Sequence, residues 1–160
     1  MSKQSQNIIL IYLLIFISIS LISAFVIEFV LGHEPCKLCE YQRIPYIVSI
    51  LLISTILILK KYKKTILLFL IITFFISSIL AFYHFGIEQG FFNESMLCEN
   101  SQKLKVLNKE ELLKQLKQTN ISCKDVDFRI LGFSLATINT IFSVVLSGIF
   151  IKLFNNYEKN

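Results

Sequence analysis

The chain has 160 residues, of which 54% are hydrophobic and 17% are charged, and its formal net charge is +5. This length gives room for one domain of ordinary size, and a mean hydropathy of +0.66 is high for a soluble core and usual for a membrane protein. The positive charge does not predict nucleic-acid binding, because the basic residues are not pooled on one surface. Residues 88–129, for example, carry seven basic and seven acidic side chains.

Four stretches without Asp, Glu, Lys or Arg predict membrane spans. They cover residues 4–27, 44–59, 65–87 and 130–151. A spanning helix needs about 20 mostly apolar residues, so three runs suffice alone. The second, at 16 residues, reaches a full span when its interfacial ends are included. We therefore predict a single all-α domain, 1–160, a four-transmembrane-helix bundle with spans over about 7–31, 42–60, 65–87 and 130–154.

The short connection 60–64 predicts the orientation of the bundle. Four of its five residues are lysines: Lys60, Lys61, Lys63 and Lys64. Because short cytoplasmic loops carry an excess of basic residues, we expect this turn and both termini to lie in the cytoplasm. The loops 32–41 and 88–129 then face the other side, which in a bacterial inner membrane is the periplasm.

Two further features are expected along the chain. Pro45 falls near the start of the second span, where proline is tolerated because the first helical N–H groups lack partners. In the long loop, Asn108 and Glu111 form a helix-capping pattern, and an apolar face follows it. We predict a short interfacial helix over Lys109–Gln118 on the membrane surface, with packing against a partner protein as the alternative.

All four cysteines fall in the two loops predicted to lie outside the cytoplasm, where disulfides persist: Cys36, Cys39, Cys98 and Cys123. One interpretation is inert disulfides that staple the loops. Cys98 and Cys123 fit it, since they would close a loop of about 25 residues and stabilise the fold by roughly 3 kcal/mol. A Cys36–Cys39 disulfide would close only a small ring and would constrain little of the unfolded chain. A zinc site is disfavoured because the second pair lacks zinc-knuckle spacing, so we expect no metal.

The third interpretation is redox chemistry at the Cys-x-x-Cys pair. Cys39 lies at the entrance to the second helix, and Arg43 follows one turn later. A helix N-terminus and a nearby cation both stabilise a thiolate, so Cys39 is the expected reactive sulfur. The loop cysteines would then shuttle electrons from a protein partner by thiol–disulfide exchange. Because the sequence has no haem, nucleotide or flavin pattern, a membrane quinone is the expected electron acceptor.

The chain resembles the bacterial disulfide bond formation protein B family, the quinone reductases that reoxidise a periplasmic thiol oxidase. The resemblance covers nearly the whole chain. It is carried by the four spans and by three motifs in order: Pro35-Cys36-x-Leu38-Cys39-x-Tyr41-Gln42-Arg43, Tyr83-His84-x-Gly86-x-Glu88-Gln89-Gly90, and Leu131-Gly132-Phe133-Ser134.

This resemblance implies redox-active disulfides Cys36–Cys39 and Cys98–Cys123. The thiol of a periplasmic DsbA-like oxidase would attack Cys98, and Cys123 would take up the electrons and exchange with Cys36. Cys39 would then be left as a thiolate beside a quinone (ubiquinone or menaquinone), with Arg43 polarising the ring carbonyl. The resemblance also makes His84 a weaker candidate for the quinone pocket.

Two alternatives stay open from the sequence. A vitamin K epoxide reductase-like enzyme also combines four helices, a Cys-x-x-Cys and a quinone, but its Cys-x-x-Cys lies in the fourth helix, whereas Cys36 and Cys39 precede the second. The other alternative is a non-catalytic membrane protein with structural disulfides only.

Overall fold

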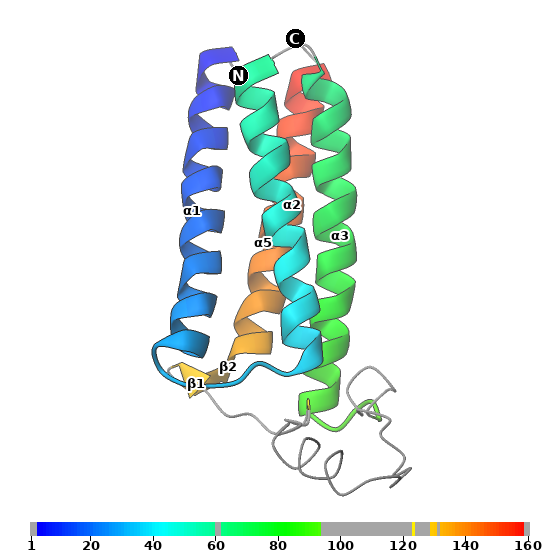
Figure 1. Cartoon of the computed structure of the whole chain (residues 1–160). Helices are drawn as coiled ribbons and strands as arrows, with labels where there is room; N and C mark the ends of the chain where they lie inside the picture. Colours follow the sequence, from blue (N-terminus) through cyan, green and yellow to red (C-terminus); the bar gives the residue numbers. More distant parts are fainter. Residues whose placement is uncertain (1–2, 60–61, 94–122, 124–128, 131, 159–160) are drawn as a thin grey trace, which may run out of the picture.

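The structure is a computed structural model of the chain that describes residues 3–59, 62–93, 123, 129–130 and 132–158. Four long helices make up most of it: α1 (Lys3–Phe29), α2 (Lys37–Leu59), α3 (Lys63–Glu88) and α5 (Leu135–Glu158). Each is long and apolar enough to cross a membrane. The predicted all-α four-helix membrane bundle is confirmed (Figure 1).

The helices run up and down, so that the two termini lie at the same end of the bundle (Figure 1). The turn between α2 and α3 is at that end as well, and the start of α2, which carries the Cys-x-x-Cys, is at the opposite end. Helix α3 packs against both α2 and α5, whereas α1 packs mainly against α2. This unequal packing leaves one side of α1 open to a cavity described below.

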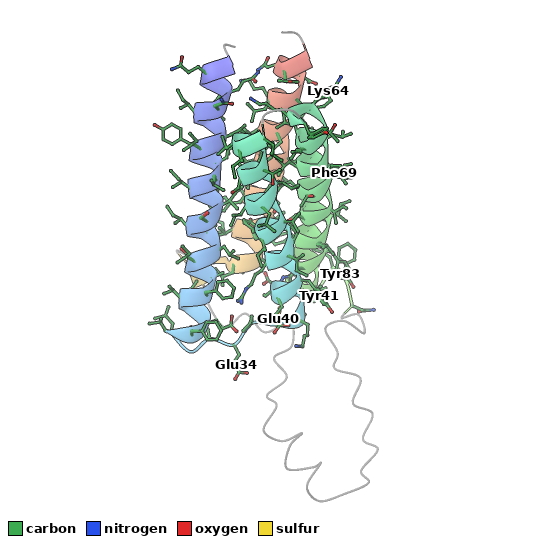
Figure 2. All side chains as sticks on the ribbon, turned by 45° about the horizontal axis from the view of Figure 1, so that its top comes forward. Glu34, Glu40, Tyr41, Lys64, Phe69 and Tyr83 are labelled. Carbon is green, nitrogen blue, oxygen red and sulfur yellow. The ribbon has the colours of Figure 1, made fainter. Side chains whose placement is uncertain are left out.

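The outer surface of the bundle is apolar along its length. Ile58 is 78% exposed, Phe75 60% and Ile79 56%, and many other large apolar side chains are similarly exposed. In Figure 2, Phe69 points outwards from α3, while Lys64 lies at one end of the bundle and Glu34 and Glu40 at the other. An apolar belt of this size exceeds what a soluble monomer exposes and is what lipid contact requires.

The interior of the bundle is also mainly apolar. A cluster of buried side chains runs through the half nearer the termini and includes Leu10, Ile53, Phe74 and Phe150. The rings of Phe74 and Phe150 stack with centroids 5.3 Å apart. Because lipid is as apolar as this core, packing and interhelical hydrogen bonds hold such helices together.

Helix α2 begins earlier than the expected position near residue 42. It starts at Lys37, so Cys39 lies in its first turn and Pro45 lies inside the helix rather than near its start. The segment after Pro35 contains no glycine or further proline before Pro45, and nothing in it opposes helix formation. The earlier start changes which cysteine occupies the helix N-terminus.

Helix α5 begins later than the expected position near residue 130. A hairpin of two short strands, β1 (Arg129–Ile130) and β2 (Phe133–Ser134), precedes it. Ser134 then caps the helix, because its Oγ accepts the N–H of Thr137 at 3.1 Å. The same hydroxyl donates to a carboxylate oxygen of Glu88 and thereby ties the start of α5 to the end of α3.

Glycine closes α3 at the cysteine end. The N–H of Phe91 donates to Gly86 C=O and that of Gly90 to Ile87 C=O, and Gly90 has a φ of +77°. This is the Schellman pattern, which favours glycine at the left-handed position. The chain then folds back so that the Phe92 ring covers Gly86 and stacks on Tyr83 at 5.6 Å.

Several expectations fall outside the described residues. They are the interfacial helix over 109–118, the state of Cys98, and two of the four lysines of the turn, Lys60 and Lys61.

Candidate functional site

The two sulfurs of the Cys-x-x-Cys lie together at the start of α2. Cys36 Sγ and Cys39 Sγ are 2.9 Å apart, share a hydrogen bond, and are both free thiols. Cys36 is 7% exposed and Cys39 is partly exposed. The structure therefore describes the reduced form of a pair that is close enough to oxidise to a disulfide after a small rotation.

Cys36 is the N-cap of α2. Its C=O accepts the N–H of Glu40 at 3.2 Å, and its Sγ accepts the N–H of Cys39 at 3.4 Å. We expected the helix N-terminus to favour a thiolate on Cys39. The earlier start of α2 instead directs the unpaired N–H groups of the first turn at Cys36.

The surroundings of Cys36 favour its ionised form. The hydrogen bond with the Cys39 thiol, with a further contribution from His84, lowers the pKa of Cys36 to about 4, although burial acts in the opposite direction. These contacts thus favour the negative charge of the reduced pair on Cys36.

His84 reaches Cys36 from α3. Its Nε2 lies 3.5 Å from Cys36 Sγ and 3.8 Å from Glu88 Oε1, and the ring is 2% exposed. The weaker of the sequence candidates is therefore in direct contact with the thiol pair. Residues 36 and 84 are far apart in the chain, and only the packing of α2 on α3 brings them together.

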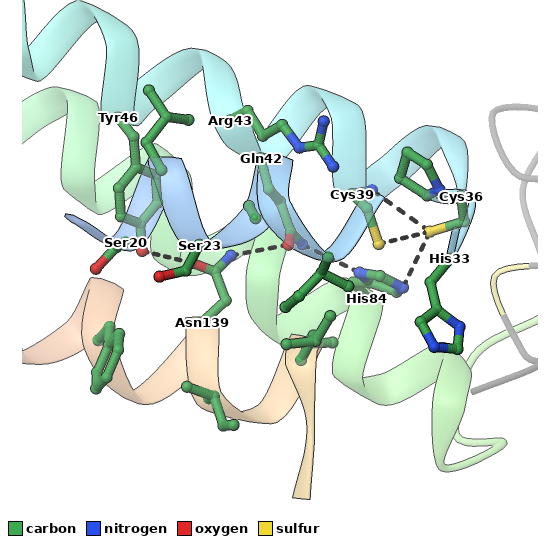
Figure 3. Close-up of a pocket in the computed structure, with 18 of the residues that line it drawn as sticks. Ser20, Ser23, His33, Cys36, Cys39, Gln42, Arg43, Tyr46, His84 and Asn139 are labelled. Atoms are coloured by element: carbon green, nitrogen blue, oxygen red, sulfur yellow. Dashed lines mark hydrogen bonds between the residues drawn. The ribbon is translucent and has the colours of Figure 1, made fainter. Parts of the chain in front are cut away.

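A line of polar side chains continues from His84 into the bundle (Figure 3). His84 Nδ1 lies 3.2 Å from Gln42 Nε2, Gln42 Oε1 accepts from Asn139 Nδ2 at 2.8 Å, and Asn139 Oδ1 accepts from Tyr46 O–H at 2.5 Å. The line joins α3, α2 and α5. In the sequence, Gln42 is part of a motif, and neither Asn139 nor Tyr46 belongs to one. Their polarity within apolar spans is the signal that identifies them.

The thiol pair and the polar line border one cavity between α1, α2 and α5, with a volume of about 560 Å³. Apolar side chains form most of its wall, among them Phe16, Ile19, Ile138 and Phe142. The same wall contains Cys36, Cys39, Gln42, Arg43, Tyr46, His84 and Asn139. An apolar cavity with a few convergent polar groups is the usual form of a small-molecule site.

Arg43 lines this cavity between α1 and α2. Its Nη1 donates to Glu28 Oε2, and its guanidinium lies 4.9 Å from the centre of the Phe25 ring. Both partners belong to α1, so Arg43 also holds the two helices together. Glu28 is thus the counter-ion of Arg43.

Cys123 is brought to the pair from the long loop. It is disulfide-bonded, 2% exposed, and part of a buried cluster with Cys36, Leu38 and Ile87. Cys98, the partner that the resemblance implies, lies outside the described residues. A disulfide-bonded loop cysteine therefore packs beside the Cys-x-x-Cys, as thiol–disulfide exchange between the two pairs requires.

Cys36, Cys39 and His84 also have the donor atoms of a metal site, with all three within 4.8 Å of one another. Two thiolates on a tetrahedral zinc ion with bonds of about 2.3 Å would lie roughly 3.8 Å apart. The sulfurs are closer, at 2.9 Å. This spacing suits a thiol pair that exchanges with a disulfide better than it suits a metal.

Comparison with known proteins gives one family. The family model described as "Disulfide bond formation protein DsbB" matches residues 6–153. A protein of Rickettsia prowazekii (strain Madrid E), described as uncharacterized, is 32% identical over 152 residues, which are 92% of this chain and 88% of the relative. No solved structure matches the chain.

Proposed function

Because the chain belongs to the DsbB family of disulfide bond formation proteins, we propose that it is a thiol:quinone oxidoreductase of the bacterial inner membrane. Membership itself makes the chain a multi-pass membrane protein of disulfide formation, from a family of oxidoreductases. The proposal adds the electron donor and the electron acceptor. The protein would reoxidise a periplasmic DsbA-like thiol oxidase and pass the electrons to ubiquinone or menaquinone.

The observation that carries the proposal is that one cavity wall contains both thiols. Cys36 and Cys39 line a largely apolar cavity between α1, α2 and α5, and the disulfide-bonded Cys123 lines it as well. Electrons that arrive through thiol–disulfide exchange on the loop side thus come within reach of a molecule bound on the lipid side.

The cavity residues fit a quinone. Phe16, Ile19 and Phe142 offer an apolar surface for a flat ring, and Arg43 offers guanidinium N–H donors for a ring carbonyl. When bound, a quinone supplies an acceptor that takes up two electrons and two protons. The residues that would hold it are Arg43 and the apolar wall, with Cys39 at the edge and His84 reaching the site through Cys36.

The protein's own steps are disulfide exchanges. The partner's dithiol reduces the Cys98–Cys123 disulfide and becomes a disulfide itself. The thiolate of Cys123 then attacks Cys36, so that the Cys36–Cys39 bond breaks and Cys39 leaves as a thiolate, which takes a proton. Attack by Cys98 on Cys123 restores the loop disulfide and releases Cys36 as a thiolate, whose environment favours that charge. Reoxidation joins Cys36 to Cys39 as two electrons and the proton of Cys39 leave the pair for the acceptor.

The proposed orientation has the termini in the cytoplasm and the cysteines in the periplasm. The termini and the α2–α3 turn lie at one end of the bundle and the start of α2 at the other (Figure 1). Lys63 and Lys64, at the first end, support the cytoplasmic assignment through the excess of basic residues in short cytoplasmic loops.

Cys39→Ser tests the mechanism directly. The variant should lose oxidation of a reduced DsbA-like partner by at least about a thousandfold, because no intramolecular disulfide can form at Cys36. The measurement is quinone reduction and partner oxidation by the purified protein in lipid nanodiscs. Ser54→Ala, a change in the last third of α2 that does not line the cavity, is the control. Full activity of Cys39→Ser would overturn the mechanism. An inactive wild-type protein whose cysteines ignore added quinone would favour a non-catalytic role.

A further inference from the structure

The polar line from His84 to Tyr46 contains three residues to which the proposed function gives no task. Gln42, Asn139 and Tyr46 lie in membrane-spanning helices, and Gln42 and Tyr46 are 6% exposed. A buried amide at such a depth is unfavourable unless its donors and acceptors are paired. The pairing found here restricts which atom of each residue can donate.

The backbone determines the orientation of the Gln42 amide. Its Nε2 lies 3.4 Å from the carbonyl oxygen of Leu80, which can only accept a hydrogen bond. The nitrogen, rather than the oxygen, must therefore point towards α3. Gln42 Oε1 then points away and accepts from Asn139 Nδ2, and Asn139 Oδ1 accepts from the Tyr46 hydroxyl. Each of these hydrogen bonds then joins a donor to an acceptor.

This orientation determines the tautomer of His84. Since Gln42 Nε2 is a donor at 3.2 Å from His84 Nδ1, that ring nitrogen accepts and carries no proton. The neutral ring then carries its proton on Nε2. Two groups that can accept lie near Nε2: Cys36 Sγ at 3.5 Å and Glu88 Oε1 at 3.8 Å. The other oxygen of Glu88 accepts from Ser134, as a carboxylate does.

We propose that Gln42 and Asn139 are positioning residues that hold His84 as the Nε2–H tautomer, so that His84 donates to Cys36 and keeps the negative charge of the reduced pair on that sulfur. Tyr46 completes the line by fixing Asn139. The chemistry is that of a histidine whose donor side is selected by the partner of its other nitrogen.

The tautomer matters for the redox pair. Reduction of the Cys36–Cys39 disulfide by two electrons and one proton gives one thiolate and one thiol. A donor from His84 at Cys36 favours the thiolate there, and the proton then resides on Cys39, which lines the cavity. The value of this arrangement in turnover rests on the proposed function, but the tautomer itself does not.

Nitrogen NMR can read the tautomer because the chain has only two histidines. The reduced protein, labelled with ¹⁵N only in histidine and placed in lipid nanodiscs, gives protonated and unprotonated ring nitrogens at separate shifts. The signals that vanish in His33→Gln belong to His33, and those that remain belong to His84. We expect a protonated Nε2 and an unprotonated Nδ1 for His84. A protonated Nδ1 in the wild-type protein would overturn the proposal.

Substitutions of Gln42 should change this signature in two different ways. Gln42→Met removes the donor at similar volume, so both tautomers should appear. Gln42→Glu replaces the donor with a carboxylate that can only accept, so Nδ1 should become protonated. If Gln42→Met fails to fold, Gln42→Glu and Asn139→Leu still test the proposal. Gln89→Met, an exposed glutamine at the end of α3, is the matched control and should leave the His84 signals unchanged.

The second measurement is the pH profile of Cys36 alkylation in reduced protein with Cys98→Ser and Cys123→Ser. Loss of the Nε2–H donor should raise the midpoint at Cys36 by about one pH unit, a roughly tenfold change in the ionisation constant. Other titratable or charged groups near this site are Cys39, Glu88, His33, Glu34 and the Arg43–Glu28 pair. They are the same in Gln42→Met and Asn139→Leu, whereas Gln42→Glu adds a carboxylate and is therefore left out of this measurement. An unchanged midpoint in Gln42→Met would contradict the proposal even if turnover fell.

Discussion

Cys36 and Cys39 are three residues apart in one motif, yet their sulfurs have different environments. Cys36 Sγ accepts from the N–H of Cys39 and lies within hydrogen-bonding distance of the Cys39 thiol and of His84 Nε2. Cys39 lines the cavity. At the scale of single residues, the two cysteines therefore differ because of the hydrogen-bond donors around them, since their residue type is the same.

The depressed pKa of Cys36 predicts an unusual pH dependence. In reduced protein that retains only the Cys36–Cys39 pair, alkylation of Cys36 by iodoacetamide should stay nearly constant from pH 8 down to about pH 5 and fall through about pH 4. For an ordinary thiol with a pKa of about 8.5, the alkylation rate would fall tenfold for each pH unit over the same range. Mass spectrometry of the singly alkylated peptide identifies the sulfur.

The same shift affects stability of the reduced form. Because the folded-state pKa of Cys36 lies below the value of an ordinary thiol, its contribution to stability is full above the ordinary thiol pKa and is lost as the pH falls towards about 4. If the rate of Cys36 alkylation instead falls tenfold for each pH unit below pH 8, Cys36 is an ordinary thiol and neither effect is expected.

At the scale of elements, the ends of the helices near the cysteines carry the specific interactions. Cys36 caps α2, Ser134 caps α5 and binds Glu88 of α3, and Gly90 terminates α3. These ends bring the thiol pair, His84 and the loop disulfide to one place. The long helical bodies between them only need to be apolar and of sufficient length.

The Phe92 ring over Gly86 makes a prediction about the end of α3. A Cβ on residue 86 would lie 2.2 Å from a ring carbon of Phe92, so Gly86→Ala must displace the ring from its stack on Tyr83. We expect a loss of about 1 kcal/mol in free energy of unfolding, which is at the low end for overpacking because Phe92 is partly exposed.

In a Phe92→Ala background the same substitution should instead stabilise by about 0.5 kcal/mol, since alanine favours a helix over glycine. Denaturation in mixed detergent micelles measures all four proteins of this cycle. If the effects of the two substitutions simply add, Phe92 does not cover Gly86.

At the scale of the whole molecule, the uneven packing of the bundle creates the candidate site. Helix α1 packs mainly on α2, and the cavity opens between α1, α2 and α5. Arg43 bridges two of these helices through Glu28 and Phe25. Its position makes it both a link in the fold and a donor at the cavity wall.

Arg43→Ala should therefore weaken quinone use while the cysteines still pair. We expect the KM for quinone to rise by tenfold or more, because a charge-assisted hydrogen bond contributes about 1.5–3 kcal/mol. Arg43→Lys should restore only part of this, since lysine keeps the charge but lacks the planar donor fork. Steady-state kinetics against quinone concentration provides the measurement.

Lys37→Ala is the matched control for Arg43. Lys37 is a basic residue of the same helix, but it is exposed and paired with Glu40. An unchanged KM in Arg43→Ala, with Lys37→Ala also unchanged, would exclude Arg43 from the quinone site. A fall in thermal stability without a change in KM would leave Arg43 with its role between the helices alone.

The four spans and the identity of the candidate thiols follow from the sequence alone. Charge-free runs of sufficient length define membrane helices locally, so their number follows without any knowledge of packing. The Cys-x-x-Cys and Arg43 are close in sequence and could be assigned to one site for the same reason. His84 entered only through the resemblance.

Which of the two sulfurs receives the hydrogen-bond donors depends on the packing of the helices and on where α2 begins. The helix start at Lys37, rather than near residue 42, made Cys36 the N-cap, and the boundary of a helix is set by its neighbours as much as by its own residues. The contacts of His84 with Cys36 and of Gln42 with Asn139 join different helices. Hydropathy describes each helix alone, and it does not specify which faces of two helices meet.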